Sequence, residues 1–285
     1  TSRGLGDVYK RQLYIIGVLG DHHLAANFKR IMGWFCISAV FWITGAILQG
    51  EWQILLWIIA AICDYTAPMH GFALPRLGRS DSSKEWTIEG HHLVERCQLF
   101  VIIAFGETLL MTGASLSEVE EWTPLVIISA VISFIGSLAM WWVYFDVSSE
   151  AGSRKIQEVK DPGKLGLIYN AIHIVLVGAL IICAVGDELI VAHPEQEMRA
   201  EVVFVLIIGP IVYILANSIY KYVTCRMLPL SHIIAVIALA LLLPWPYHIS
   251  LLTMNILVTS VFIFVIVFDM LFPNKGFKIK WEPKI

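Results

Sequence analysis

Residues Gly90 to Leu110 read GHHLVERCQLFVIIAFGETLL, a charged opening that leads into a long apolar run. A single carboxylate, Glu107, lies deep inside that run. Placing a charge in a helix that crosses the hydrocarbon core costs at least about 2.5–3.5 kcal/mol, so acidic residues there are rare and are usually functional. The stretch therefore predicts a membrane-spanning helix that carries a candidate functional acid.

The spacing within this stretch relates its charged residues to one another. His92 and Arg96 are four positions apart and share a helix face. Glu107 follows Arg96 by close to three helical turns, so it lies on the same face but roughly 16 Å further along the axis. Arg96 therefore cannot neutralise Glu107, and we expect the partner of Glu107 to come from another helix.

The composition of the whole chain indicates an integral membrane protein. Of its 285 residues, 58% are hydrophobic and only 15% are charged, and the mean hydropathy is +0.74. A soluble domain carries about 25% charged residues. We therefore expect an all-α, polytopic transmembrane bundle whose partner is the lipid bilayer. The net charge of −3 and the absence of a basic patch give no indication of nucleic-acid binding.

Hydropathy predicts about eight full spans and a partial one near the N-terminus. Residues 1–12 resemble a translated sequencing adaptor and are set aside. We expect a transmembrane domain over residues 13–272 and a cytoplasmic tail over residues 273–285. Pro210 should kink the sixth span. The spans are expected at about 31–49, 52–74, 97–116, 124–145, 165–191, 200–222, 230–244 and 249–272.

Lysine and arginine residues gather on alternate loops, which predicts the orientation. Cytoplasmic loops carry the excess of these residues, so the C-terminus is expected in the cytoplasm. The opposite loops are acidic, and we interpret their acids as solvated loop charges in preference to a site that captures cations: Glu118, Glu120, Glu121, Asp187, Glu188, Glu195, Glu197 and Glu201. Only Arg199 is basic there, and 16 basic residues occupy the other side: Lys29, Arg30, Arg76, Arg79, Lys84, Arg96, Arg154, Lys155, Lys160, Lys164, Lys221, Arg226, Lys275, Lys278, Lys280 and Lys284.

Three ionisable residues are expected at one depth, near the bilayer midplane: Asp64, Glu107 and His173. Each lies eight to ten residues from the cytoplasmic end of its span, or about 12–15 Å. Two ionised acids beside a neutral histidine are untenable in a low dielectric, so one acid should stay protonated, the histidine should charge, or a cation should bind. This arrangement predicts a proton-relay or substrate site; the alternative is a structural cluster of hydrogen bonds that bridge helices.

A second polar cluster is expected at the cytoplasmic boundary. Within it Arg96 and Asp146 are the preferred ion pair, because both are expected at that interface. An interfacial salt bridge and a gate or ligand-binding site are equally compatible with the pattern. The cluster comprises His70, His92, Glu95, Arg96, Asp146 and Asp269.

Several of these residues also carry a family resemblance. His92-Leu93-Val94-Glu95-Arg96, Leu99-Phe100, Ile102-Ile103 and Gly106-Glu107 resemble the signature of the bacterial low temperature requirement A (LtrA) family. Trp141–Asp146, His173, Gly209-Pro210 and Tyr213 add to it, over roughly residues 31–272. The resemblance implies a multi-pass protein of the bacterial cytoplasmic (inner) membrane. The family name reports a growth phenotype and implies no chemistry.

Three functional classes compete. The first is a proton-coupled transporter of a small solute. The second is a non-catalytic membrane scaffold or a sensor of stress or cold. The third, a metalloenzyme using His91, His92 and Glu95, is disfavoured because Arg96 would repel a metal. The chain has no nucleotide-binding loop, nucleophile elbow or zinc spacing, so no catalytic residue, metal or cofactor is expected.

The relay hypothesis predicts an infrared signal from Glu107. In a full-length relative in lipid, a protonated carboxyl band should titrate between about pH 5 and 8 and disappear in Glu107→Gln, because a working acid has a shifted protonation equilibrium. A band that is absent, or that does not move over this range, would leave Glu107 a structural residue.

Overall fold

The computed structural model is predominantly helical and confirms the all-α class. It describes residues 23–48, 50–81, 90–119, 121–146, 161–244, 249–272 and 276–278. The set-aside segment 1–12 and the partial span expected near residue 13 lie outside the described residues. The chain forms two compact units, one of Thr1–Ile88 with Val159–Leu167 and Ile285, the other of Glu89–Glu158 with Ile168–Lys284.

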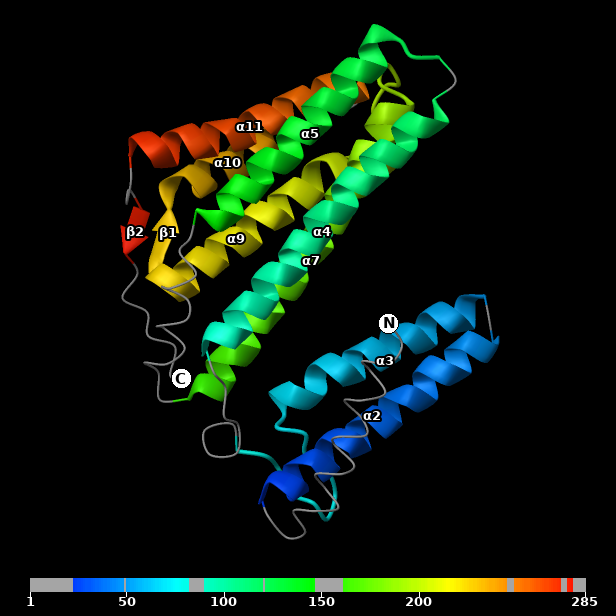
Figure 1. Cartoon of the computed structure of the whole chain (residues 1–285), viewed down its shortest axis with the longest axis vertical. Coiled ribbons are helices and arrows are strands. Elements are labelled where there is room, and N and C mark those ends of the chain that lie inside the picture. The colour runs from blue at the N-terminus through cyan, green and yellow to red at the C-terminus, as the bar shows by residue number, and fades with distance from the viewer. Residues whose placement is uncertain are drawn as a thin grey trace. The chain divides into compact units, whose positions relative to one another are not determined.

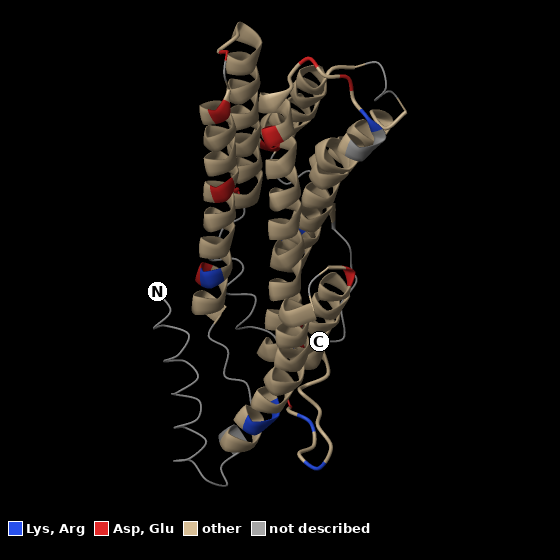
Figure 2. Ribbon diagram, turned by 90° about the vertical axis from the view of Figure 1, so that its right-hand side faces the viewer, with Lys and Arg blue, Asp and Glu red and all other residues tan. Residues whose placement is uncertain are grey.

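Seven helices in the described part of the chain are long and apolar enough to cross a membrane. Charged residues are sparse along them (Figure 2). The remaining predicted span, 230–244, is the short helix α10, Leu230–Leu241. The long helices are α2 (His23–Leu48), α3 (Glu51–Met69), α4 (Gly90–Glu118), α5 (Pro124–Phe145), α7 (Pro162–Ala192), α9 (Gly209–Cys225, continuing from the π-helix η1, Phe204–Ile208) and α11 (Leu251–Leu271).

In the first unit, α2 and α3 pack side by side as a helical hairpin (Figure 1). The segment after α3 returns to α2, where Arg30 donates to the Leu77 carbonyl at 2.8 Å and to Ser80 Oγ at 2.9 Å. Ser80 in turn donates to Asn27 Oδ1 at 2.6 Å. Arg30, which the sequence placed in a loop, is therefore a buried residue within a helix.

In the second unit, α5 packs between α4 and α11, and α10 packs between α9 and α11 (Figure 1). Hydrogen bonds add α7 to this bundle, because His173 bonds Tyr144 of α5 and Tyr169 bonds Tyr220 of α9. The buried face of α4 includes Val94 and Val101. These buried residues recur at helical spacing and so share one face of α4, which is why α4 is packed on that side only.

Just before Pro210, where the sequence predicts a kink, the helix contains a π-helical turn. The short helix α8 (Ala200–Val203) runs into η1, and α9 begins at Gly209. Pro210 lies in the first turn of α9, directly after η1, and has no N–H to donate to the carbonyls of that turn. Single π-turns are rare and often mark functional sites. The helix is therefore irregular at one defined level and continues beyond it.

Part of the expected C-terminal tail forms a strand. Residues Gly276–Lys278 (β2) pair antiparallel with Met227–Pro229 (β1), the link between α9 and α10. Their register sets Leu228 opposite Phe277. This ribbon is the one sheet in the described residues, and it ties the segment after α11 to the α9–α10 turn.

Glycines allow close helix contacts in the second unit. A Cβ on Gly136 of α5 would lie 2.9 Å from Thr259 Oγ1 of α11, and one on Gly209 would lie 2.8 Å from Ile182 Cγ2 of α7. Small residues at such contacts let backbones approach in a membrane, where packing and hydrogen bonds hold helices together.

We expect Gly136→Ala to destabilise the bundle. The substitution gains up to about 1 kcal/mol of helix propensity, but overpacking a tight contact costs about 1–3 kcal/mol. Thermal unfolding in detergent, followed by tryptophan fluorescence, measures the difference. Gly113→Ala is the matched control, because a Cβ there meets nothing within 4 Å. Equal behaviour of the two variants would contradict the close contact.

Candidate functional site

A buried carboxylate, Asp187, is the centre of the most developed polar site in the second unit. It lies in the last turns of α7 and is 7% exposed. The side chains of Ser133 and Ser137, one helical turn apart on α5, interact with it. Within the described residues no Lys, Arg or His is paired with Asp187. Among the residues that the structure describes, the carboxylate is therefore held by hydroxyl groups without a compensating cation.

A hydrogen-bonded pair from α11 completes this site. Asn255 Nδ2 donates to Ser133 Oγ at 2.9 Å, and Thr259 Oγ1 donates to Asn255 Oδ1 at 3.3 Å. The Ser133 oxygen thus accepts from Asn255, which leaves its own hydrogen for Asp187. Thr259 donates its hydroxyl hydrogen to Asn255, so the lone pairs of its oxygen stay available. The chain of bonds links three helices, α5, α7 and α11, at one level.

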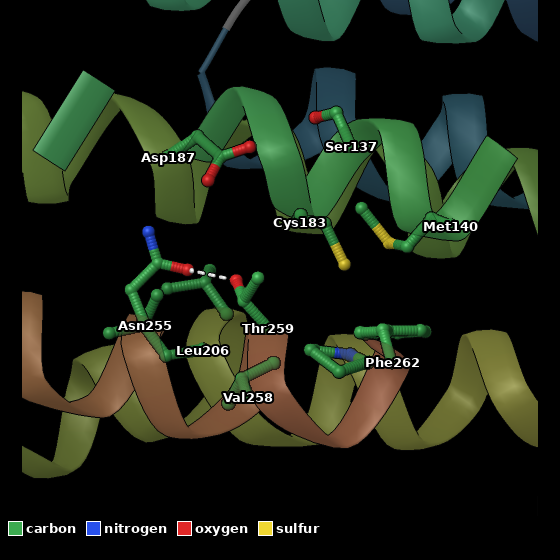
Figure 3. Close-up of a pocket in the computed structure, with 12 residues that line it drawn as sticks. Ser137, Met140, Cys183, Asp187, Leu206, Asn255, Val258, Thr259 and Phe262 are labelled. Carbon is green, nitrogen blue, oxygen red and sulfur yellow. Dashed lines mark hydrogen bonds between the residues drawn. The ribbon is translucent and has the colours of Figure 1, made fainter. Parts of the chain in front are cut away.

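Asp187, Ser137, Asn255 and Thr259 border a cavity of about 30 Å³. Figure 3 shows Asp187, Ser137, Cys183 and Met140 on one side and Asn255, Thr259 and Phe262 on the other. Val205, Leu206 and Pro210 from the π-helix and the start of α9 also line it. The volume suits one or two molecules of the size of water, since a water needs at least about 10–15 Å³ of such space. The cavity is polar at the Asp187 end and apolar at the Phe262 end.

The sequence analysis placed Asp187 among solvated outer-loop acids, and the structure corrects this. The span expected at residues 165–191 already contained Asp187, but its position near the span's end favoured solvent. A usable signal was present on two other spans. Ser133 and Ser137, and also Asn255 and Thr259, are polar pairs four residues apart in otherwise apolar runs, so each pair shares one helix face.

His173, the predicted midplane histidine, lies in a tyrosine cluster and is 1% exposed. Its Nδ1 donates to the Tyr169 carbonyl at 2.7 Å, so its Nε2 accepts from the Tyr144 hydroxyl at 2.8 Å. Tyr144 stacks on Tyr220 with ring centroids 5.3 Å apart. Both ring nitrogens of His173 are therefore engaged by tyrosines.

The two other midplane candidates have different surroundings. Glu107 is exposed on α4, together with His92 and Arg96. Asp64 belongs to the first unit, where Trp42 Nε1 of α2 donates to its Oδ2 at 3.0 Å. This hydrogen bond bridges α2 and α3. It is of the kind that the alternative interpretation of the midplane residues, a structural cluster of helix-bridging hydrogen bonds, predicts. Within the second unit, the described contacts do not join Glu107 to His173.

The boundary cluster contains a cation that the sequence analysis missed. Lys221 Nζ lies 3.1 Å from Asp146 Oδ2 and 3.2 Å from Asp269 Oδ2. Lys221 is 6% exposed, so it is a buried residue of α9 and not the loop residue that was expected. The expected pair of Arg96 with Asp146 is therefore wrong, because Lys221 is the partner of Asp146 and Arg96 is exposed. Asp146 and Asp269 do meet, through this shared lysine.

The other members of that cluster lie elsewhere. His70 caps α3 in the first unit, and its Nδ1 bonds the Thr66 carbonyl at 3.0 Å. At the start of α4, the Nδ1 atoms of His91 and His92 lie 3.3 and 3.5 Å from Glu95 Oε2. The ligand atoms of these three exposed residues lie within 4.8 Å of one another, so they are close enough to hold a metal ion.

Comparison with known proteins gives a family. The family model for "Bacterial low temperature requirement A protein (LtrA)" matches residues 9–267. The chain belongs to the LtrA family. This LtrA protein is also 34% identical over 220 residues to an uncharacterized protein of Rhizobium meliloti (strain 1021). That match covers 76% of the chain and 53% of the relative, so the chain spans about half the length of the curated relative. No solved structure matches.

The residues that carried the LtrA resemblance divide into exposed and buried groups. His92, Glu95 and Glu107 are exposed on α4. Tyr213 is fully buried, and its hydroxyl donates to the Met140 carbonyl at 2.7 Å. The buried motif residues of this LtrA protein thus hold the bundle together around the Asp187 cavity and the tyrosine cluster.

We expect Lys221→Met to destabilise the LtrA bundle. Removing one partner of a fully buried ion pair costs about 3–5 kcal/mol, and the cost here should be smaller, because the Asp146 side chain is 48% exposed and that of Asp269 is 21% exposed. Thermal unfolding in detergent should show a drop, partly restored by Lys221→Met/Asp269→Asn. The exposed Arg199→Met is the control and should change stability by no more than about 0.5 kcal/mol. A double variant less stable than the single one would contradict the ion-pair assignment.

Proposed function

We propose that the protein is a proton-coupled transporter of a small solute and that Asp187 takes up and releases the proton. The observation that supports this most is a buried carboxylate that lines a cavity and has no cationic partner among the described residues. Ionisable residues inside a membrane bundle commonly mark ion pathways or proton relays. A carboxylate held only by hydroxyl groups is able to exist protonated or ionised, as coupling requires.

The irregular helix beside this cavity supports the same proposal. Val205 and Leu206 belong to η1, and Pro210 follows it. Transporters commonly build their substrate and ion sites where a membrane helix is interrupted, because the irregular backbone lines a cavity there. The acid and the irregular helix line one cavity in this chain, which favours an ion site over a purely structural network.

Glu107, His173 and Asp64 stay candidates for further steps of a proton route. We place the protein in the bacterial cytoplasmic membrane with its C-terminus in the cytoplasm, on the strength of its loop charges and bacterial family. In this orientation Asp187 lies toward the outer side and the Lys221 triad toward the cytoplasm. Proton exchange at Asp187 is then with the outside, and release to the cytoplasm requires the bundle to change conformation.

The proposal predicts proton movement that depends on Asp187. The chain is reconstituted in liposomes holding a pH-sensitive dye, and amino acids, sugars, organic acids and inorganic cations are added one class at a time. At least one class should move protons in the wild type, with the rate lowered about tenfold or more in Asp187→Asn, since the amide cannot carry a proton.

Glu188→Gln is the matched control for this experiment. It removes the same charge from the next residue of α7, which is only partly buried and does not line the cavity. Its proton flux should equal that of the wild type. The proposal would be overturned if none of the solute classes moved protons in the wild type. Equal proton flux in Asp187→Asn and the wild type would overturn it as well.

A further inference from the structure

We infer that the Asp187 cavity binds a monovalent inorganic cation of the size of Na⁺, in exchange for the carboxyl proton. This inference rests on the proposed function and names the ion that the same site would exchange. It depends on the charge of the site, the oxygen atoms around it and the space between them.

The single negative charge of the site favours a ligand with a single positive charge. Asp187 is the one carboxylate among the residues that line the cavity, and the only other titratable group there is Cys183. An isolated buried charge is costly in a low dielectric, so the carboxylate needs either a proton or a cation. A monovalent cation makes the site neutral, whereas a divalent cation would leave an excess positive charge and an anion would be repelled.

The oxygen atoms around the cavity suit a hard cation. Besides Asp187, the hydroxyl-bearing residues Ser137 and Thr259 line the cavity, and the Thr259 hydrogen is already directed to Asn255. The Val205 carbonyl oxygen lies beside Gly186, the residue before Asp187, at 3.5 Å from where a Cβ would be. The residues that line the cavity thus bring oxygen-bearing side chains from α5, α7 and α11 to it, and the backbone of η1 runs beside them.

The space excludes larger or more hydrated ions. The cavity of about 30 Å³ holds one or two water-sized particles. Mg²⁺ keeps several waters and Ca²⁺ takes six to eight oxygen ligands, usually with more than one carboxylate. Organic ammonium ions need more volume. Soft monovalent ions such as Ag⁺ prefer sulfur, and Met140 and Cys183 offer it at the other end, so the test includes Ag⁺.

The exchange is balanced in atoms and charge. When the cation enters, the O–H bond of the protonated Asp187 breaks, the proton leaves to water, and the carboxylate oxygen contacts the cation. No oxidant or co-reactant takes part. Acidic conditions therefore favour the proton and alkaline conditions favour the cation.

The inference is tested by equilibrium binding of radioactive sodium to the purified chain in detergent. Saturable binding is expected at alkaline pH, with affinity falling as the pH is lowered. Asp187→Asn should raise the dissociation constant roughly tenfold or more, equivalent to at least about 1.4 kcal/mol. Glu188→Gln should bind like the wild type. Size-exclusion chromatography shows that each variant is folded and monodisperse.

A second pair of variants tests the contribution of one hydroxyl oxygen while Asp187 and its charge stay in place. Thr259→Val is close in shape to threonine and lacks the hydroxyl, so it should weaken sodium binding several-fold, while Thr259→Ser should keep it. The inference is overturned by the absence of saturable sodium binding to folded wild type, by equal binding in Asp187→Asn, or by Ag⁺ binding in its place.

Different results would contradict the proposed proton-coupled transport and the inferred sodium site. If sodium does not bind but another solute still moves protons through Asp187, proton-coupled transport stands and the sodium inference is wrong. If sodium binds at Asp187 with an affinity independent of pH, the cation site stands and the proton coupling is wrong.

Discussion

The hydrocarbon core of a membrane offers no hydrogen bonds, and this constraint explains both the helices and the way their polar side chains are used. Every backbone group must find its partner within the chain. Most hydroxyls on the helices bond back to their own backbone, as Thr112 does to the Thr108 carbonyl and Ser218 to the Ile214 carbonyl. Others join neighbouring helices, as Asn255 does with Ser133. Asp187 differs from both kinds, because it is a carboxylate that borders a cavity and has no cation beside it among the described residues.

The polar groups of the second unit form successive levels along the helices. The carboxylate site at Asp187 is followed by a packed level in which Tyr213 bonds the Met140 carbonyl and its ring meets Phe262 with centroids 5.9 Å apart. His173 and its tyrosines come next, and Lys221 with its two carboxylates lies at the far end. Polar levels separated by tight aromatic packing let each site keep its own charge state, and any coupling between them must pass through a change in packing.

The sequence predicted the all-α class, the family and nearly every span, because length and hydropathy are local properties of a membrane helix. It located the charged groups less well. Arg30 and Lys221 were taken for loop residues although both are buried in helices, since a sequence does not say which face of a helix end is covered. Asp187 was taken for a solvated acid for the same reason. Its site is assembled from α5, α7 and α11, and which faces meet across three helices is set by tertiary packing.

The π-helix has a consequence for comparing relatives. A π-turn holds one more residue than an α-turn, and each residue advances a helix by about 100°. Val202 and Gly209, seven positions apart, would share a face of a regular helix, but η1 lies between them and turns them apart. A relative with a regular helix here should align only with a one-residue gap between residues 203 and 209. An ungapped alignment would assign the lipid-facing residues of one protein to the cavity of the other.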